Sequence, residues 1–328
     1  MNNLMMMERI KMFNLNSLWF WIKCTLVFCI LILIYQFWQE GRVELPELLI
    51  RLRSAHLGWL LIGVVLSVIF IGLQAEMYVW SFRSVQEHIG RWSATILFLK
   101  RNFVSVFLPG GSVSSLATFS QSIEKQGVTK VKVSIASTIY IISGLVTLWI
   151  VAVPAIIYAI KEQEASSTEE ISLLVVTLML LFVVFVVISI SQKNKWYQLI
   201  AKKFPNFIKH LDTFSHTPLS IKALLMTNSV SMALEIVSIL LFYIALRAVG
   251  IETGWVTPIL AYTLSTLILS VAPVARGVGA VELSLLYILN HSGIDMASAL
   301  TVTLIYRFFG FWLPLLIGGF SFINRKNM

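Results

Sequence analysis

Long apolar runs alternate with short polar segments along this chain, and the pattern predicts a bundle of membrane-spanning helices. A helix needs roughly twenty predominantly apolar residues to cross the hydrocarbon core of a bilayer. Runs of that kind cover residues 18–38, 57–81, 131–160, 171–190, 223–246 and 296–322. The expected fold is therefore an all-α polytopic membrane protein with six full spans.

A further segment, residues 93–122, is apolar but too interrupted to cross the membrane. Lys100 and Arg101 lie inside its first half. A helix is then expected to break at three successive residues, Pro109, Gly110 and Gly111, because proline lacks an amide donor and glycine adds backbone freedom. The hydroxyl-rich sequence that follows either hydrogen-bonds a ligand or satisfies the broken backbone. This pattern predicts a hairpin of short helices that enters and leaves on the same side.

A second hairpin is predicted for residues 258–291. Its two apolar runs, 258–272 and 278–291, are each shorter than a full span. The break between them contains Pro273, Gly277 and Gly279. Broken backbone is tolerated inside a bilayer only where it lines a cavity or is buried in protein. The pattern leaves open whether either hairpin is re-entrant or fully spanning.

The order of span, hairpin and span occurs twice, over residues 57–160 and 223–322. The single span between these copies predicts that the second is inverted relative to the first. Each copy carries one glutamate inside its leading span, Glu76 or Glu235. Inverted repeats whose broken segments meet near the midplane are typical of alternating-access transporters. The alternative is coincidence, because apolar helices with a single glutamate are not rare.

The composition agrees with a membrane protein and predicts its orientation. Of 328 residues, 58% are hydrophobic and 12% are charged, which is about half the charged fraction of a soluble domain. The net charge is +9, but the basic residues lie in loops beside the spans, so no nucleic-acid partner is expected. With a cytoplasmic N-terminus, the inner loops hold 18 Lys and Arg against 4 acids, and the outer loops hold 5 against 9. The positive-inside rule therefore places both termini in the cytoplasm.

The stretch from residue 270 to 282 contains the first candidate for a functional site. Arg276 and Glu282 lie beside the second predicted break, in a chain end that is otherwise apolar. Ionisable residues at membrane depth commonly mark substrate pathways, and a forked guanidinium suits a phosphate group. Half-helices that begin after Gly111 and Gly277 would add oriented N–H donors. The alternative is an internal ion pair that only joins two helices.

Two motifs at the predicted breaks extend this picture. The late motif comprises Pro273, Gly277, Gly279, Glu282, Arg307, Trp312, Leu313 and Pro314, and the early motif comprises Asn102, Pro109 and Gly110. Together they resemble the transmembrane region of the lysylphosphatidylglycerol synthase/flippase family. Two departures stand out: Ala275 and Arg276 replace the usual glycines, and Ser114, Ser115 and Thr118 replace an acid and an arginine.

The resemblance implies a flippase that moves a phospholipid or a polyprenyl-phosphate-linked lipid between leaflets, in a bacterial or archaeal plasma membrane. Relatives that attach lysine to phosphatidylglycerol do so with a cytosolic domain after the membrane region. This chain ends six residues after its last predicted span, so we expect no enzyme activity, and no cofactor or metal. The expected substrate-binding residues are Arg276, Glu282, Arg307, Asn102, Pro109, Gly110, Gly111, Pro273, Gly277 and Gly279.

Glu76 and Glu235 are candidates for proton coupling, because a desolvated carboxyl group titrates nearer to neutral pH. A polar contact between helices is the alternative role for each of them. For the whole protein, the alternatives to a flippase are a lipid scaffold or a non-transporting subunit, and an intramembrane enzyme that acts on a lipid-linked substrate. A membrane lipid is the expected partner, and the oligomeric state is open.

Overall fold

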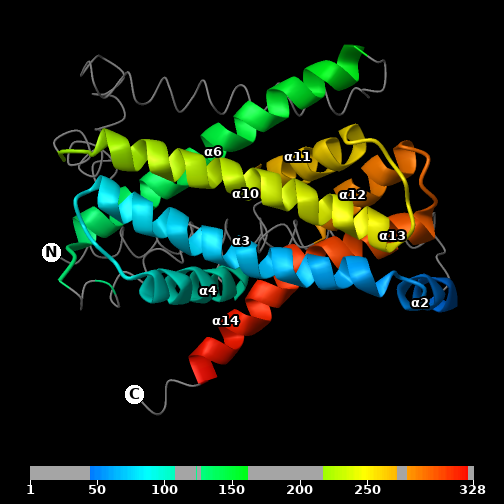
Figure 1. Ribbon diagram of the computed structural model, residues 1–328, viewed down its shortest axis with the longest axis horizontal. Coiled ribbons are helices and arrows are strands. Elements are labelled where there is room, and N and C mark those ends of the chain that lie inside the picture. Colours follow the sequence, from blue (N-terminus) through cyan, green and yellow to red (C-terminus); the bar gives the residue numbers. More distant parts are fainter. Residues whose placement is uncertain (1–44, 108–122, 124–126, 162–216, 272–278, 324–328) are drawn as a thin grey trace, which may run out of the picture.

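A computed structural model of the protein describes residues 45–107, 123, 127–161, 217–271 and 279–323, and within them all regular structure is helical (Figure 1). Four segments are long and apolar enough to cross a membrane. They are Leu57–Ser84 (α3), Lys130–Tyr158 in α6 (Lys130–Lys161), Ile221–Ala248 (α10) and Met296–Gly319. The last segment joins α13 (Met296–Arg307), a π-helical turn η2 (Phe308–Trp312) and α14 (Leu313–Ile323).

These four segments agree with four of the predicted spans, at residues 57–81, 131–160, 223–246 and 296–322. The predicted spans at 18–38 and 171–190 lie outside the described residues, so the total of six stays a prediction. The polytopic all-α class of the described part is confirmed.

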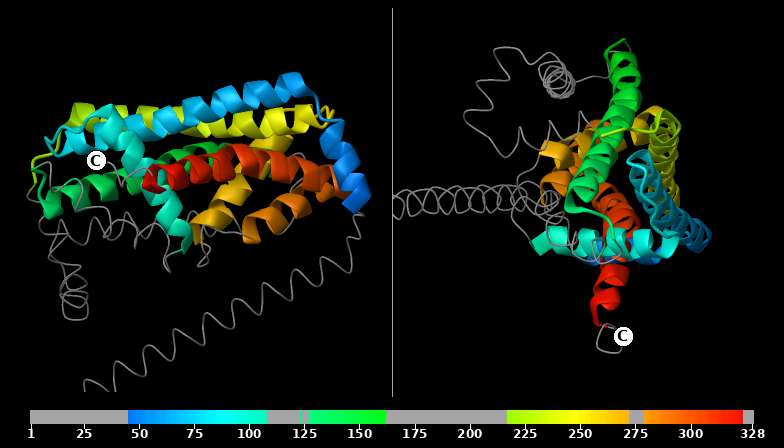
Figure 2. Two further views of the ribbon diagram at one scale, coloured as in Figure 1. Left: turned by 90° about the horizontal axis from the view of Figure 1, so that it is seen from below. Right: turned by 90° about the vertical axis from the view of Figure 1, so that its left-hand side faces the viewer.

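The helices α3 and α10 run antiparallel and lie side by side along the bundle (Figure 1 and Figure 2). Each begins where the other ends. The amide of His56 donates to the carbonyl of Ala248 at 2.8 Å, and the amide of Ser220 donates to the carbonyl of Ser84 at 2.9 Å. Both helices have 28 residues, and the two hydrogen bonds join equivalent positions. Residues 56 and 220 are separated by 164 positions, and residues 84 and 248 are separated by the same number. The two helices are therefore related by an approximate two-fold axis.

The C-terminal ends of α3 and α10 also share one local structure. The amides of Glu87 and Ile251 each donate to the carbonyl five positions earlier, both at 3.0 Å. This closure requires a left-handed residue just before the donor. Gln86 (φ 61°) and Gly250 (φ 83°) occupy that position, and they are again 164 positions apart. Glycine adopts this conformation without the steric cost that glutamine bears.

The helix α4 (Arg91–Phe107) follows α3 and packs against both α3 and α14. A Cβ atom at Gly318 would lie 2.5 Å from the carbonyl oxygen of Leu99, so only a glycine lets α14 come this close to the α4 backbone. The helix is not among the four membrane-crossing segments, which agrees with the prediction that residues 93–108 do not cross. Residues 108–122, the rest of this predicted hairpin, lie outside the described residues.

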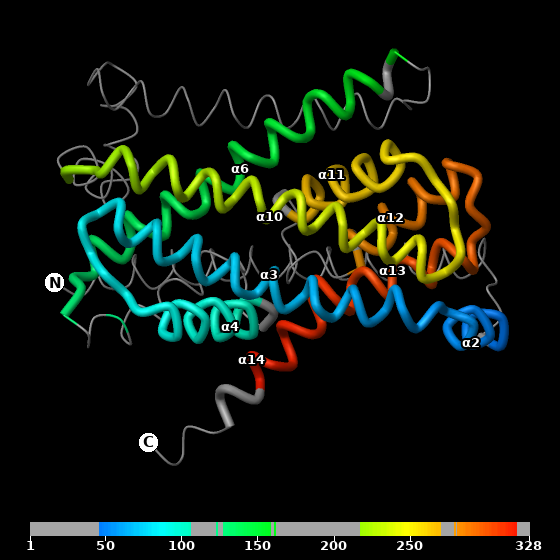
Figure 3. Tube along the Cα trace, in the orientation of Figure 1, coloured from blue at the N-terminus to red at the C-terminus, as the bar shows by residue number. Residues whose placement is uncertain are grey.

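The second predicted hairpin corresponds to two short helices, α11 (Val256–Val271) and α12 (Ala280–His291), which pack against each other (Figure 3). Gly279 has a φ of 89° and begins α12. An L-residue rarely adopts that φ, so the predicted break is confirmed at Gly279. Pro273 and Gly277 lie outside the described residues.

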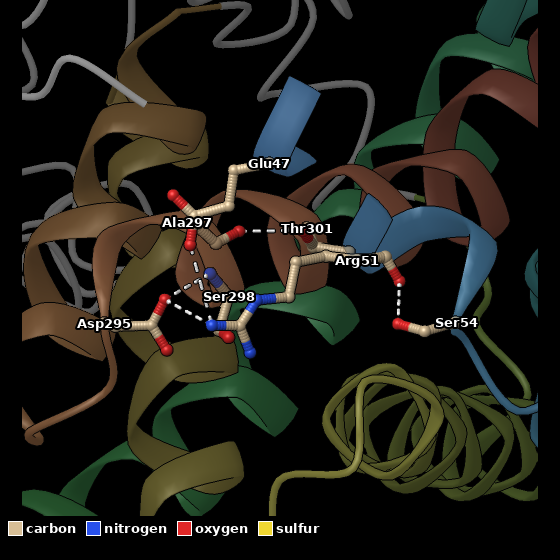
Figure 4. Close-up of polar contacts among 7 residues, drawn as sticks. All are labelled: Glu47, Arg51, Ser54, Asp295, Ala297, Ser298 and Thr301. Atoms are coloured by element: carbon tan, nitrogen blue, oxygen red, sulfur yellow. Dashed lines mark hydrogen bonds and ion pairs between the residues drawn. The ribbon is translucent and has the colours of Figure 1, made fainter. Parts of the chain in front are cut away.

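The short helix α2 (Leu45–Arg53) contacts the start of α13 (Figure 4). Arg51 Nη2 lies 3.5 Å from Asp295 Oδ1, and the amide of Ser298 donates to the same oxygen at 3.0 Å. Asp295 therefore caps α13 and also joins it to α2. This contact connects the segment before α3 to the turn between α12 and α13.

Buried apolar side chains form two large clusters. One cluster draws on α3, α4 and the first part of α6, within residues 71–139. The other draws on α10, α11, α12 and α13, within residues 237–309, with Leu148 of α6 added. Each cluster thus lies mainly within one of the two segments that the sequence pattern predicts to be repeats.

Candidate functional site

Glu282 connects two helices at the first turn of α12. Its Oε2 atom accepts the amide N–H of Gly279 at 2.7 Å, which closes the N-terminus of its own helix. Its Oε1 atom accepts from Nε of Arg307 at 2.6 Å, at the end of α13. The two side chains thus form an ion pair between α12 and α13. One carboxylate therefore fixes both the break before α12 and the position of the guanidinium.

This ion pair involves the central residue of a segment that is long and apolar enough to cross a membrane. The helices α12 and α13 have 12 residues each and are joined by a short turn. At 1.5 Å per residue, Glu282 is about 14 Å and Arg307 about 17 Å from the helix ends at that turn, roughly half of the ~30 Å hydrocarbon core of a bilayer. Arg307 is also central in the membrane-crossing segment Met296–Gly319. A charged pair at this depth is costly and therefore marks a candidate functional site.

The guanidinium of Arg307 has further capacity for hydrogen bonding. Its side chain is 6% exposed, and its Nη2 atom is buried with no hydrogen-bond partner in the described part of the chain. The hydroxyl of Thr303, one turn earlier on the same face, is also buried without such a partner. The Arg307 Cζ atom lies 4.3 Å from the centroid of the Phe311 ring, in a cation–π contact. The helix widens into the π turn directly after Arg307, a feature common at functional sites.

Glu235 lies in a different polar cluster, near the middle of α10. Its carboxylate accepts from the hydroxyl of Tyr262 at 2.6 Å and lies 3.3 Å from the hydroxyl of Thr147. Thr147 in turn lies 2.7 Å from the hydroxyl of Ser231. Within the described residues, the partners of this carboxylate are hydroxyl groups alone. The cluster joins α6, α10 and α11 through a residue that is only 6% exposed.

Glu76 has a different environment. Its two carboxylate oxygens accept from Nε and Nη2 of Arg91 at 2.8 and 3.0 Å, a bidentate contact between α3 and α4. The Arg91 side chain is 78% exposed. A bidentate guanidinium stabilises the ionised carboxylate, so this glutamate is better suited to joining two helices than to exchanging a proton.

Of the remaining expected site residues, Asn102 is described and several others are not. Asn102 lies in α4 with 1% exposure, and both polar atoms of its amide are buried without a hydrogen-bond partner among the described residues. The residues outside the described part are Arg276, Pro109, Gly110, Gly111, Pro273 and Gly277. Their assignment to a substrate site stays a prediction.

The sequence pattern did not indicate the partners of either candidate proton carrier. Tyr262 and Thr147 contact Glu235 from other helices, and they lie 27 and 88 positions from it along the chain. The available signal was weak: Ser231 precedes Glu235 by one helical turn and gives α10 a polar face. Arg91, the partner of Glu76, was counted only as a loop charge. Lys100 and Arg101 were interpreted only as interruptions of a span, although both are buried.

A search of curated proteins returns no match. A family model described as "Lysylphosphatidylglycerol synthase TM region" matches residues 20–318, which is nearly the whole chain and includes both motifs. The chain therefore belongs to the lysylphosphatidylglycerol synthase transmembrane-region family.

Proposed function

We propose that this protein moves a lipid with a phosphate-bearing headgroup between the two leaflets of its membrane. The observation that carries the proposal is the Glu282–Arg307 pair, in which a guanidinium at mid-membrane depth keeps the buried Nη2 atom without a partner among the described residues. A charged headgroup is costly to bring into hydrocarbon. Fixed polar donors at this depth would lower that cost while the acyl chains stay in lipid. Arg276 is proposed to join Arg307 at the phosphate.

The geometry also supports an inverted repeat. The contacts at the ends of α3 and α10 and the local structures that close their C-termini recur at one spacing of 164 positions. The two apolar clusters divide the chain into the same two segments. The two glutamates do not follow this spacing. At 164 positions, Glu235 corresponds to Ile71 and Glu76 corresponds to Leu240. A role in proton coupling is therefore proposed for Glu235 alone.

The membrane context of the proposal comes from the distribution of basic residues. Both termini are proposed to face the cytoplasm of a bacterial or archaeal cell, because the predicted inner loops carry most of the lysines and arginines. In that orientation the α12–α13 turn faces outward.

Lipid movement can be measured with the purified protein in liposomes that contain a fluorescent phospholipid. A quencher added outside removes the signal of the outer leaflet, and continued loss of signal reports lipid movement. We expect loss beyond the outer leaflet with the wild-type protein and a return to the empty-liposome level with Arg307→Met. An unchanged rate in a folded Arg307→Met protein would contradict the role given to Arg307.

The same preparation separates the proposal from its alternatives. A lipid scaffold or a non-transporting subunit would leave the quenched fraction at the level of empty liposomes, even with wild-type protein. An intramembrane enzyme would instead change the chemical composition of the lipid, which mass spectrometry of the extracted lipids detects. The family match covers a membrane region and not a transferase domain, which favours lipid movement.

A further inference from the structure

The hydroxyl of Thr303 in α13 is buried and makes no hydrogen bond within the described residues. The residue is 0% exposed, and its Oγ1 atom is one of the buried polar atoms without a partner there. A threonine inside a helix can donate its hydroxyl to the carbonyl one turn earlier. Thr301 is equally buried and does so, because its hydroxyl donates to the carbonyl of Ala297 at 2.7 Å. The backbone of α13 therefore does not occupy the Thr303 hydroxyl.

Two contacts hold the guanidinium of Arg307 in place. Its Nε atom donates to Glu282 at 2.6 Å, and its Cζ atom lies 4.3 Å from the centroid of the Phe311 ring. These contacts leave Nη2, which is buried and has no hydrogen-bond partner in the described part of the chain. Leaving a buried charged donor unpaired is destabilising. The orientation of Arg307 therefore indicates that a further acceptor binds at Nη2.

Thr303 and Arg307 lie on the same face of α13. Residues four positions apart in an α-helix are neighbours on its surface, with about 5–6 Å between their Cβ atoms. A helical side chain also leans toward the N-terminus of its helix, which brings Arg307 toward the turn that carries Thr303. The two unpartnered atoms, Oγ1 and Nη2, do not bond each other. A group with two acceptor oxygens could receive a hydrogen bond from each of them.

The charge balance at Arg307 favours a second donor that is neutral. Glu282 lies 2.6 Å from the guanidinium and balances its charge, so an anion bound at Nη2 depends on hydrogen bonds more than on net charge. The hydroxyl of Thr303 supplies such a bond without a further charge to bury. Because Thr303 is 0% exposed and Arg307 is 6% exposed, these bonds would form inside protein, where they are electrostatically stronger than in water.

We propose that Thr303 and Arg307 bind one phosphate group together, with the Thr303 hydroxyl donating to one oxygen and Arg307 Nη2 donating to another. This inference rests on the proposed function, which brings the phosphate of a lipid headgroup to Arg307. A soluble phosphate presents the same oxygens. Thr303 is then a substrate-binding residue, whereas Thr301 has a structural role. Protein encloses both binding groups, so the site has to open before a headgroup enters, as movement between leaflets requires.

Thr303→Val removes the hydroxyl and keeps the shape of the side chain. Because it also removes an unpaired buried polar atom, the thermal midpoint in detergent should stay or rise. The affinity for phosphatidylglycerol, titrated by native mass spectrometry, should fall about tenfold, as expected for the loss of a hydrogen bond to a charged group. Thr303→Ser keeps the hydroxyl and should bind phosphatidylglycerol as the wild type does.

Thr301→Val is the matched control, because it removes an equally buried hydroxyl from the same helix, one that already donates to the backbone. It should leave the affinity for phosphatidylglycerol unchanged, and any change in its thermal midpoint should be a decrease. Wild-type affinity in Thr303→Val would overturn the proposal. An equal loss of affinity in Thr301→Val or in Thr303→Ser would also overturn it, because the loss would not depend on the Thr303 hydroxyl.

Inorganic phosphate distinguishes the two sources of the bound group. If millimolar phosphate displaces phosphatidylglycerol from the wild-type protein, the site takes a soluble anion, and if it does not, the site takes the headgroup. Binding is measured without transport, so this proposal and the proposed function can fail separately. Affinity that depends on Thr303, beside absent lipid movement in wild-type liposomes, would support this site and reject the proposed function. Wild-type affinity in Thr303→Val, beside active lipid movement, would do the reverse.

Discussion

The Glu282–Arg307 contact is either a structural link between α12 and α13 or part of a lipid site, and a double-mutant cycle separates the two. Glu282→Gln keeps an oxygen for the Gly279 amide but removes the charge that faces Arg307. The Arg307 side chain is only 6% exposed, so an uncompensated buried cation should cost about 3–5 kcal/mol of unfolding free energy. Arg307→Met leaves a carboxylate that is 22% exposed and still accepts the Gly279 amide. Its cost should be smaller, about 1–3 kcal/mol.

The double variant should be less destabilised than the sum of the single variants, because no buried charge is left without a partner. We expect a coupling energy of about 1–3 kcal/mol, measured from denaturant-induced unfolding in mixed micelles. If the losses of unfolding free energy in the two single variants sum to the loss in the double variant within about 0.5 kcal/mol, the two residues are not an energetically coupled pair. Lipid movement then decides its role. A structural link predicts that the double variant recovers transport together with stability, whereas a headgroup site predicts that transport stays lost.

Three other predictions follow from single contacts. Gly318→Ala would place a Cβ atom 2.5 Å from a carbonyl oxygen of α4 and should lower the free energy of unfolding by about 1–3 kcal/mol. Gly310→Ala is the control, because a Cβ atom there would meet no heavy atom within 4 Å, and it should lower the free energy of unfolding by less than about 0.5 kcal/mol. Equal losses in the two variants would contradict this packing. If Glu235 carries the proton, lipid movement in the wild type should change with pH between about pH 5 and 8, and Glu235→Gln should remove that dependence. Glu76→Gln should instead lower thermal stability and leave the pH profile of lipid movement intact. An unchanged pH profile in Glu235→Gln would exclude proton coupling at Glu235. Partial burial raises the pKa of Asp295, but the hydrogen bonds from Ser298 and the positive charge of Arg51 outweigh it, so the pKa is lowered overall. A carboxyl group with a depressed pKa stabilises the fold at neutral pH and loses that contribution as the pH falls through its folded pKa. The side chain is 55% exposed, so the contribution should stay below about 1 kcal/mol. Thermal midpoints from pH 7 to pH 3 should therefore fall slightly less in Asp295→Asn than in the wild type, and an identical fall would contradict the shift.

The helices themselves could be predicted because membrane insertion depends on a property that the sequence displays directly. Twenty apolar residues must be helical in lipid, since the backbone has no other source of hydrogen bonds there. The predicted bounds of 223–246 therefore agree closely with the observed α10, and Gly279 was expected at a break for the same kind of backbone reason. The pairing of Glu282 with Arg307 was also predictable, because few other charges are available at that depth.

Partners that come from distant helices could not be predicted in this way. Glu235 is one carboxyl group among many hydroxyl-bearing residues, and hydropathy alone does not select Tyr262 and Thr147 from them. The same limit affected α4. A hydropathy scale assigns one cost to Lys100 and Arg101 whether they face lipid, water or protein, and so treats them only as interruptions of a span. Burial shows that they face protein, where Arg101 lies over the rings of Tyr78 and Tyr140. A charged residue inside an apolar segment of the sequence is therefore a candidate functional residue, because burying a charge at membrane depth is costly and such residues commonly have a functional role.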